Sequence, residues 1–178
     1  MPLTPPHDLQ HDLQHDCTQC MALCCVAPSF DAVQGFGYDK PAHTACRHLA
    51  TNHRCQVHGD LAGAGFPACA AFDCHGAGQR ATAQFGGPQA VLDAPTRQRL
   101  YAHYQRLVRL HGVWYLLHVA AEAHRDATVQ AALAPAAQRL AAASAQPPHT
   151  LTEVVAQQLQ QDGLAALRGI AHRLRLPR

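Results

Sequence analysis

The sequence has few charged side chains and no long hydrophobic run. Only 15% of its 178 residues are charged, with a single lysine and two glutamates, and the formal net charge is +2. No apolar stretch approaches the roughly 18 residues that a membrane-spanning helix needs, and the first residues lack a cationic start followed by an apolar stretch. These absences argue against a membrane span and against export, and they predict a cytoplasmic protein.

Cysteine, by contrast, is abundant and confined to one half of the chain. All eight cysteines lie between positions 17 and 74, and none follows. A reducing cytosol does not sustain a disulfide framework, so we interpret these residues as free thiols or metal ligands. The candidate metal ligands are Cys17, Cys20, Cys24, Cys25, Cys46, Cys55, Cys69 and Cys74.

Charge and composition divide the chain at about residue 93. Residues 1–93 hold four basic residues against eight aspartates, whereas residues 94–178 hold ten arginines against four acidic residues. Gly and Pro interrupt the first part repeatedly, which predicts short segments with too few large apolar residues to hold together without metal. We expect a flexible polar leader over 1–16, a cysteine-rich metal-binding module over 17–93 and a helical region over 94–178.

Apolar residues recur at three- and four-residue spacing in the second part of the chain. They predict one helix over about 95–124 and an Ala-rich helix over about 127–144 that bends or restarts near Pro135. Thr150 and Glu153 fit a capping box that opens a third helical stretch. The expected fold class is mainly α, with a loop-rich cysteine module packed against a small C-terminal helical bundle or hairpin.

The first four cysteines are spaced like one face of a helix. In a helix, Cys17, Cys20 and Cys24 would lie within about 60° of one another, so three sulfurs could cap one metal centre. A further thiolate would then come from the cysteines between positions 46 and 74. Cys25 would point elsewhere, and we expect it to serve a second site or to remain a buried thiol. Eight thiols fit two four-thiolate centres, or one centre with spare cysteines.

The other polar features do not define a catalytic site. The N-terminal repeat would align His7, His11 and His15 in a helix, but a polar leader lengthened by duplication is the simpler interpretation. Arginines recur along the helical region, and a solvated helix face is preferred to nucleic-acid binding because few aromatics and one lysine accompany them. No Ser-His-acid order or carboxylate pair stands out. Whether the chain is an enzyme therefore stays open.

The short sequence segments that contain the cysteines match a known pattern. The run CTQCMALCC, followed by ACRHL, RCQVH, GFPAC and FDC, resembles the YkgJ-like cysteine-cluster family of zinc- or iron-chelating bacterial proteins. The cysteine region of flagellin lysine N-methylase belongs to the same group. Residues 17–87 are also similar to the leading segment of actinobacterial proteins labelled pentapeptide-repeat-containing, although no such repeats follow here. The resemblance implies a bound metal centre, iron-sulfur in the first place, and no particular reaction.

Three functions are consistent with these observations. We prefer an iron-sulfur protein for electron transfer or a cluster-dependent modification, because the thiolate supply lacks a clean pair of Cys-x2-Cys knuckles. The first alternative is a zinc-stabilised adaptor that binds a protein partner through its helices. The second is a thiol redox or metal-handling protein with an exchangeable site. We expect a protein partner, and neither nucleic acid nor membrane.

Overall fold

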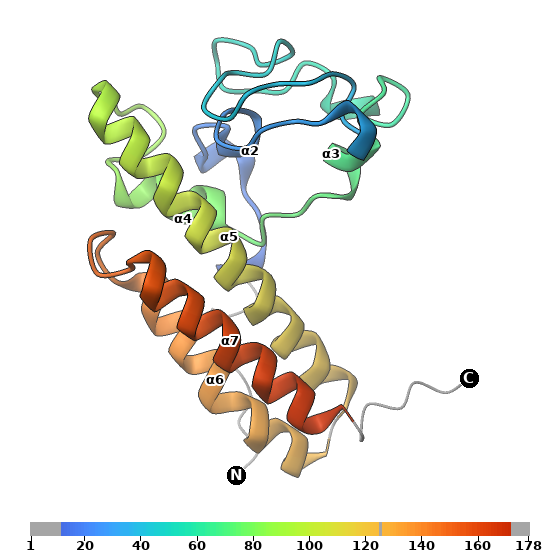
Figure 1. Cartoon of the computed structure of the whole chain (residues 1–178), viewed down its shortest axis with the longest axis vertical. Helices are drawn as coiled ribbons and strands as arrows, with labels where there is room; N and C mark the ends of the chain where they lie inside the picture. The colour runs from blue at the N-terminus through green and yellow to red at the C-terminus, as the bar shows by residue number, and fades with distance from the viewer. Residues whose placement is uncertain (1–11, 125, 172–178) are drawn as a thin grey trace. The chain divides into compact units, whose positions relative to one another are not determined.

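The computed structural model describes residues 12–124 and 126–171, and in this part the protein is mainly helical (Figure 1). The described residues form six α-helices, α2 to α7, with three short 3-10 helices and two isolated β-bridges but no sheet. This confirms that the fold class is mainly α, as expected. The predicted leader falls largely on residues 1–11, so most of it, with His7 and His11, lies outside the described residues.

The described residues form two compact units. The cysteine unit spans His15–Gln105 and holds all eight cysteines. The helical unit comprises residues 12–14, 106–124 and 126–171. Helix α5 (Ala94–Ala123) contributes residues to both units, because the division falls after Gln105.

The cysteine unit consists of short elements joined by turns. Two antiparallel β-bridges, Phe30 with Lys40 and Leu49 with Cys55, close its largest loops. Its helical segments are η1 (Cys17–Gln19), α2 (Leu23–Val26), η2 (Ala32–Gln34), η3 (His58–Asp60), α3 (Pro67–Ala71) and α4 (Ala77–Gln84).

Aromatic rings form the core of these loops. Phe66 and Phe30 are 2% and 5% exposed. The Phe30 ring stacks on Phe36 with the centroids 4.6 Å apart, and the edge of Tyr38 meets Phe66 at 6.0 Å. Such pairs contribute about 0.5–1.5 kcal/mol each beyond the area that they bury. The loops therefore have an apolar anchor of their own.

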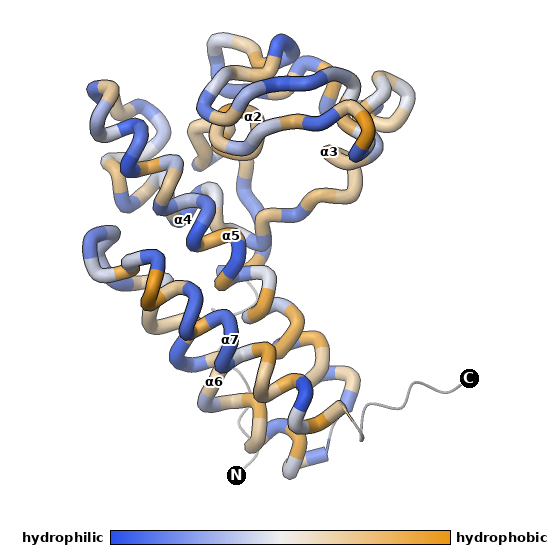
Figure 2. The backbone as a smooth tube through the Cα atoms, viewed as in Figure 1, coloured by the Kyte–Doolittle hydropathy of each residue, from blue (hydrophilic) through white to orange (hydrophobic). Residues whose placement is uncertain are grey.

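The helical unit is built from the second half of α5, α6 (Ala127–Ala145) and α7 (Glu153–Ile170). Helices α6 and α7 lie side by side (Figure 1). The three helices approach closely at Gly163, where a Cβ atom would lie 2.5 Å from Val113 Cγ1 and 3.4 Å from Leu140 Cδ1. Hydrophobic and hydrophilic residues alternate along these helices in Figure 2. The side chains that fill the core between them include Leu107, Leu110, Leu117, Leu133 and Leu140.

The two long helices that the periodicity predicts are confirmed within one residue at each end. Helix α6 continues through Pro135 without restarting. The capping box is wrong by two residues, because Thr152 is the N-cap of α7 and its hydroxyl accepts a hydrogen bond from Val155 N. The hydroxyl of Thr150 instead donates to the carbonyl of Pro147. None of the described helices has the length and apolar character needed to cross a bilayer.

Candidate thiolate site

The first four cysteines do not share one helix, so the predicted helical face is wrong. Cys17 begins η1, Cys20 is extended with φ −119° and ψ 142°, and α2 begins only at Leu23. Between them Ala22 has a left-handed backbone with φ 55°, which is unfavourable for a residue other than glycine. This sharp turn, rather than helical spacing, brings Cys24 back toward the earlier cysteines. Periodicity could not reveal it.

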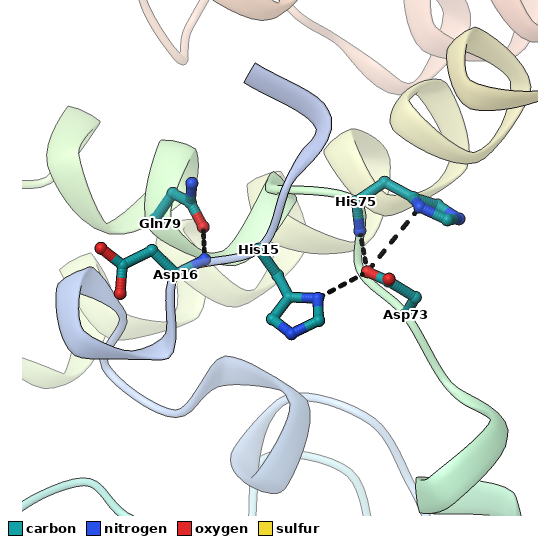
Figure 3. Close-up of polar contacts among 5 residues, drawn as sticks. All are labelled: His15, Asp16, Asp73, His75 and Gln79. Carbon is teal, nitrogen blue, oxygen red and sulfur yellow. Dashed lines mark hydrogen bonds and ion pairs between the residues drawn. The ribbon is translucent and has the colours of Figure 1, made fainter. Parts of the chain in front are cut away.

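The start of this run is held against the α4 segment by polar contacts (Figure 3). The Asp16 amide donates to Gln79 Oε1, and His15 Nδ1 lies 3.1 Å from Asp73 Oδ1. The same carboxylate oxygen accepts from the backbone amide of His75 at 2.7 Å. Burial acts to raise the pKa of Asp73, but the hydrogen bonds from His75 and His15 prevail and lower it. An ionised Asp73 therefore ties residue 15 to the segment that follows Cys74.

Two cysteines distant in sequence meet at a glycine in the first turn of α4. A Cβ atom on Gly78 would lie 2.8 Å from Cys20 Sγ and 3.6 Å from Cys74 Sγ. One turn further along α4, the buried Thr82 accepts from Met21 N at 3.1 Å, and its hydroxyl also bonds the Cys20 thiol. The structure thus brings a thiol of the opening run beside one from the later group, and only glycine leaves room for both.

The thiols around this glycine all have raised pKa values. Burial raises the pKa of Cys74 to about 11, against the effect of amides at the start of α4. Burial also raises the pKa values of Cys17 and Cys20, and the nearby Cys24 thiol adds to both shifts. For Cys24, contact with the Cys25 thiol, whose sulfur lies 3.9 Å away, raises the pKa first and burial adds to it. Without a cation these four thiols would be neutral at pH 7.

The remaining cysteines lie in α2, in the loops that follow it and in α3. The Cys46 amide donates to the Cys25 carbonyl at 3.0 Å, and Cys55 forms the bridge with Leu49. Cys69 lies in α3, where burial and then the Cys24, Cys46 and Cys55 thiols raise its pKa to about 11. The eight predicted ligands are therefore in one unit, and Cys46 and Cys69 have neighbours in the opening run, Cys25 and Cys24 respectively.

Two residues that the sequence did not single out border the thiols. Tyr104 is 3% exposed, and its hydroxyl has no hydrogen-bond partner among the described residues. Burial raises its pKa well above the ordinary value, and the Cys24 and Cys74 thiols contribute. Lys40 is also 3% exposed. The sequence offered one signal for Lys40, which is that the chain has no other lysine. Tyr104 gave no such signal, because its spacing in the predicted helix is that of an ordinary core residue.

The sulfurs of the described cysteines do not converge on a metal site in this structure. As the side chains stand, no group of three or more His, Cys, Asp or Glu residues within 12–124 and 126–171 could hold a metal ion. All eight cysteines are free thiols. Gly78 leaves the space that a Cβ would fill, and Tyr104 holds a buried donor without an acceptor. Binding would need loss of the thiol protons and closer approach of the sulfurs.

Comparison with known proteins gives one distant relative. The chain is 34% identical over 105 residues to the uncharacterized protein YybG of Bacillus subtilis (strain 168). The alignment covers 58% of this chain and 38% of YybG, so the chain spans well under half of that protein's length. No family model matches the chain. No solved structure matches it either.

Proposed function

We propose that the cysteine unit binds a thiolate-ligated metal centre, an iron-sulfur cluster in the first place, for electron transfer or a cluster-dependent modification. The observation that carries this proposal is the meeting of Cys20 and Cys74 on Gly78, across more than 50 residues of sequence. Thiolate sulfurs brought together from distant parts of a chain are the ligands that zinc and iron-sulfur centres use. Cys17 and Cys24 adjoin the same pair and supply a full set of four sulfurs.

The polar groups around these four sulfurs support the assignment. Amides from the start of α4 and the Thr82 hydroxyl already donate to Cys74 and Cys20. The Tyr104 hydroxyl lacks an acceptor that a metal-bound sulfur would provide. Hydrogen bonds to sulfur tune the potential of iron-sulfur centres, so these donors suit a redox role. The resemblance to the YkgJ-like family points to the same class of ligand, and a reducing cytoplasm would keep the thiols available.

Anaerobic purification of the full chain with metal analysis tests the proposal. We expect a brown protein with broad visible absorption and with iron and acid-labile sulfide in equal amounts. Gly78→Val should remove most of this absorption, because the added side chain displaces the Cys20 sulfur. Gly169→Ala is the matched control, since a Cβ at that helical glycine meets nothing within 4 Å. Colourless protein without bound metal would refute the proposal.

A zinc-stabilised adaptor is the second candidate. It is favoured by apolar side chains that the helical unit leaves exposed, since Leu116 and Val119 of α5 are 49% and 41% exposed. A structural zinc site would hold the loops of the cysteine unit while the helices bind a protein partner. Colourless protein with stoichiometric zinc would favour this alternative over iron-sulfur.

A further inference from the structure

Two side chains between positions 73 and 79 hold the start of the opening cysteine run. Asp73 Oδ1 lies 3.1 Å from His15 Nδ1, and Gln79 Oε1 accepts a hydrogen bond from the Asp16 amide (Figure 3). The partners are 58 and 63 residues apart in the sequence, so neither contact is local. Together they fix which residues of the run face α4.

A third contact holds the other end of the same run. The hydroxyl of Thr82, which is 0% exposed, accepts a hydrogen bond from the Met21 amide at 3.1 Å. Cys17 and Cys20 lie between this contact and the first two, and the 3-10 helix η1 adjoins α4. The run is therefore held against α4 on both sides of its first two cysteines. We call the three acceptor side chains the clamp, namely Asp73, Gln79 and Thr82.

The clamp encloses the place where two sulfurs meet. A Cβ atom on Gly78 would lie 2.8 Å from Cys20 Sγ and 3.6 Å from Cys74 Sγ, so both sulfurs border one small space on α4. A shift of the run by one residue along α4 would take Cys20 away from this space. The contacts that set the register therefore also set the pairing of the two thiols.

Backbone strain lies beside the same contacts. Ala22 has φ 55° directly after Met21, and His75 has φ 46° directly after Cys74. Left-handed residues other than glycine persist only where their surroundings hold them. The Met21 amide is bound by one member of the clamp, and the His75 amide donates to another at 2.7 Å. The clamp thus holds the two sharp turns that point the thiols toward each other.

We propose that the clamp positions Cys20 beside Cys74 before any metal is present, and that this pair captures the metal first. The inference rests on the proposed function and deepens it by naming the first two ligands. Residues 12–124 and 126–171 hold no complete metal-binding group, so further ligands have to be recruited after the first two. A pair that is already in place loses less freedom when it binds, which strengthens binding. Each thiol releases its proton to solvent as the metal binds.

The competing explanation is that the clamp only stabilises the cysteine unit as a whole. Its loss would then loosen the unit throughout and would expose buried thiols far from α4 in sequence, such as Cys46, which is 7% exposed. If the clamp is a positioning device, its loss separates Cys20 from Cys74 and leaves Cys46 protected. The two explanations therefore differ in which thiols respond.

Dibromobimane measures the pairing in the metal-free full chain, because it becomes fluorescent when two neighbouring thiols each displace one of its bromides. Six Cys→Ser substitutions leave Cys20 and Cys74 as the reacting pair. In this background Asp73→Ala should lower the linking rate by about fivefold, since the loss of its hydrogen bonds frees the run. Asp73→Asn keeps an acceptor oxygen and should link at nearly the original rate. Asp39→Ala is the matched control, because Asp39 also accepts from a backbone amide, that of Ala32 at 2.7 Å, but lies outside the clamp.

A second set of measurements keeps all eight cysteines, in case the serine background does not fold. Anaerobic titration with Co²⁺, read by thiolate-to-cobalt absorption, should show binding that is about tenfold weaker in Asp73→Ala and Thr82→Val than in Asp39→Ala. Thr82→Ser keeps the hydroxyl and should bind like wild type. Pulsed alkylation of the metal-free Asp73→Ala protein, read by mass spectrometry, should find Cys46 as protected as in wild type.

Each result decides between the explanations. Slower linking and weaker Co²⁺ binding in Asp73→Ala, with Cys46 still protected, support the clamp as a positioning device. Equal behaviour of Asp73→Ala and Asp39→Ala would overturn it, and so would loss of Cys46 protection together with slower linking. A wild-type chain that binds no metal of any kind would refute the proposed function, whereas the linking rates would still decide whether the clamp pairs the two thiols.

Discussion

The two units bury their residues in different ways. The helical unit has a core of leucines such as Leu110 and Leu140, each at most 1% exposed, and its buried polar pair is satisfied because His111 Nε2 lies 2.6 Å from Ser144 Oγ. The cysteine unit has an aromatic core of Phe30 and Phe66, and it also buries a lysine, a threonine and a histidine, namely Lys40, Thr82 and His103. It also contains every described non-glycine residue with positive φ, namely Ala22, His43, His53 and His75.

This difference indicates what each unit needs in order to fold. Leucine packing supplies its own driving force, so the helical unit should be stable by itself. Left-handed non-glycine residues and buried polar groups persist only where the surroundings hold them in place. In the cysteine unit those surroundings include the eight cysteine thiols, which the proposed metal would hold together. Its stability should therefore depend on a bound metal.

Metal removal should have the largest effect and should separate the units. A thiolate metal site contributes on the order of 10 kcal/mol to folding, so a chelator under anaerobic reducing conditions should expose residues 17–88 to protease first. The helices from residue 106 onward should resist for longer. Protein treated with metal-saturated chelator is the control. Simultaneous cleavage of both parts would show that they unfold as one cooperative system.

Leu140→Ala tests whether the helical unit can lose stability without an effect on the cysteine unit. Leu140 is 1% exposed and adjoins Gly163, so its truncation leaves a cavity and should destabilise the helical unit by roughly 2–5 kcal/mol. Urea denaturation followed by circular dichroism would measure this loss. Metal content should stay at the wild-type level, and its loss would contradict the independence of the two units.

Two glycines in the helical unit should respond to the same substitution with opposite sign. Gly163→Ala places a methyl group 2.5 Å from Val113 Cγ1, and such overpacking should cost about 1–3 kcal/mol. Gly112→Ala meets nothing within 4 Å and should stabilise α5 by about 0.5–1 kcal/mol through helix propensity. Thermal denaturation of the two variants beside wild type checks both. A stabilising Gly163→Ala would mean that the helices can separate at no cost.

The last prediction concerns pH in the reduced, metal-free protein. The pKa of Cys74 rises from an ordinary value near 9 to about 11 on folding, so the folded state retains this proton to higher pH than the unfolded state. Its contribution to stability is complete below pH 9 and is lost as pH rises toward 11. We expect the free energy of unfolding to fall by up to about 2.7 kcal/mol over this range. The free energy of unfolding of Cys74→Ser should fall less steeply with pH than that of wild type. An equal slope would contradict the assignment of this effect to Cys74.

Periodicity made the long helices predictable, because three- and four-residue spacing of apolar side chains is visible within one segment. The same reasoning failed for Cys17, Cys20 and Cys24, where spacing suggested a helix and Ala22 instead reverses the chain. Local sequence patterns also missed Thr152 as the N-cap of α7, because Thr150 with Glu153 matched the capping-box pattern.

The neighbours of the thiols depend on contacts across the sequence. The closeness of Cys20 to Cys74 at Gly78, and the burial of Lys40 by loop carbonyls, involve residues that no local pattern relates. The membership of the cysteine set could be proposed from spacing and composition. The contact of Cys20 and Cys74 at Gly78 could not.

Burial of Lys40 also gives the molecule a built-in chemical reporter. It is the only lysine in the sequence, and carbonyl oxygens hold its amine out of solvent. Amine acylation at residue 40 can proceed only when the loops around it open, so its rate under a short pulse measures how often they do. The helical unit contains no lysine and contributes nothing to that signal. One mass-spectrometric peak therefore records the opening of the cysteine unit by itself.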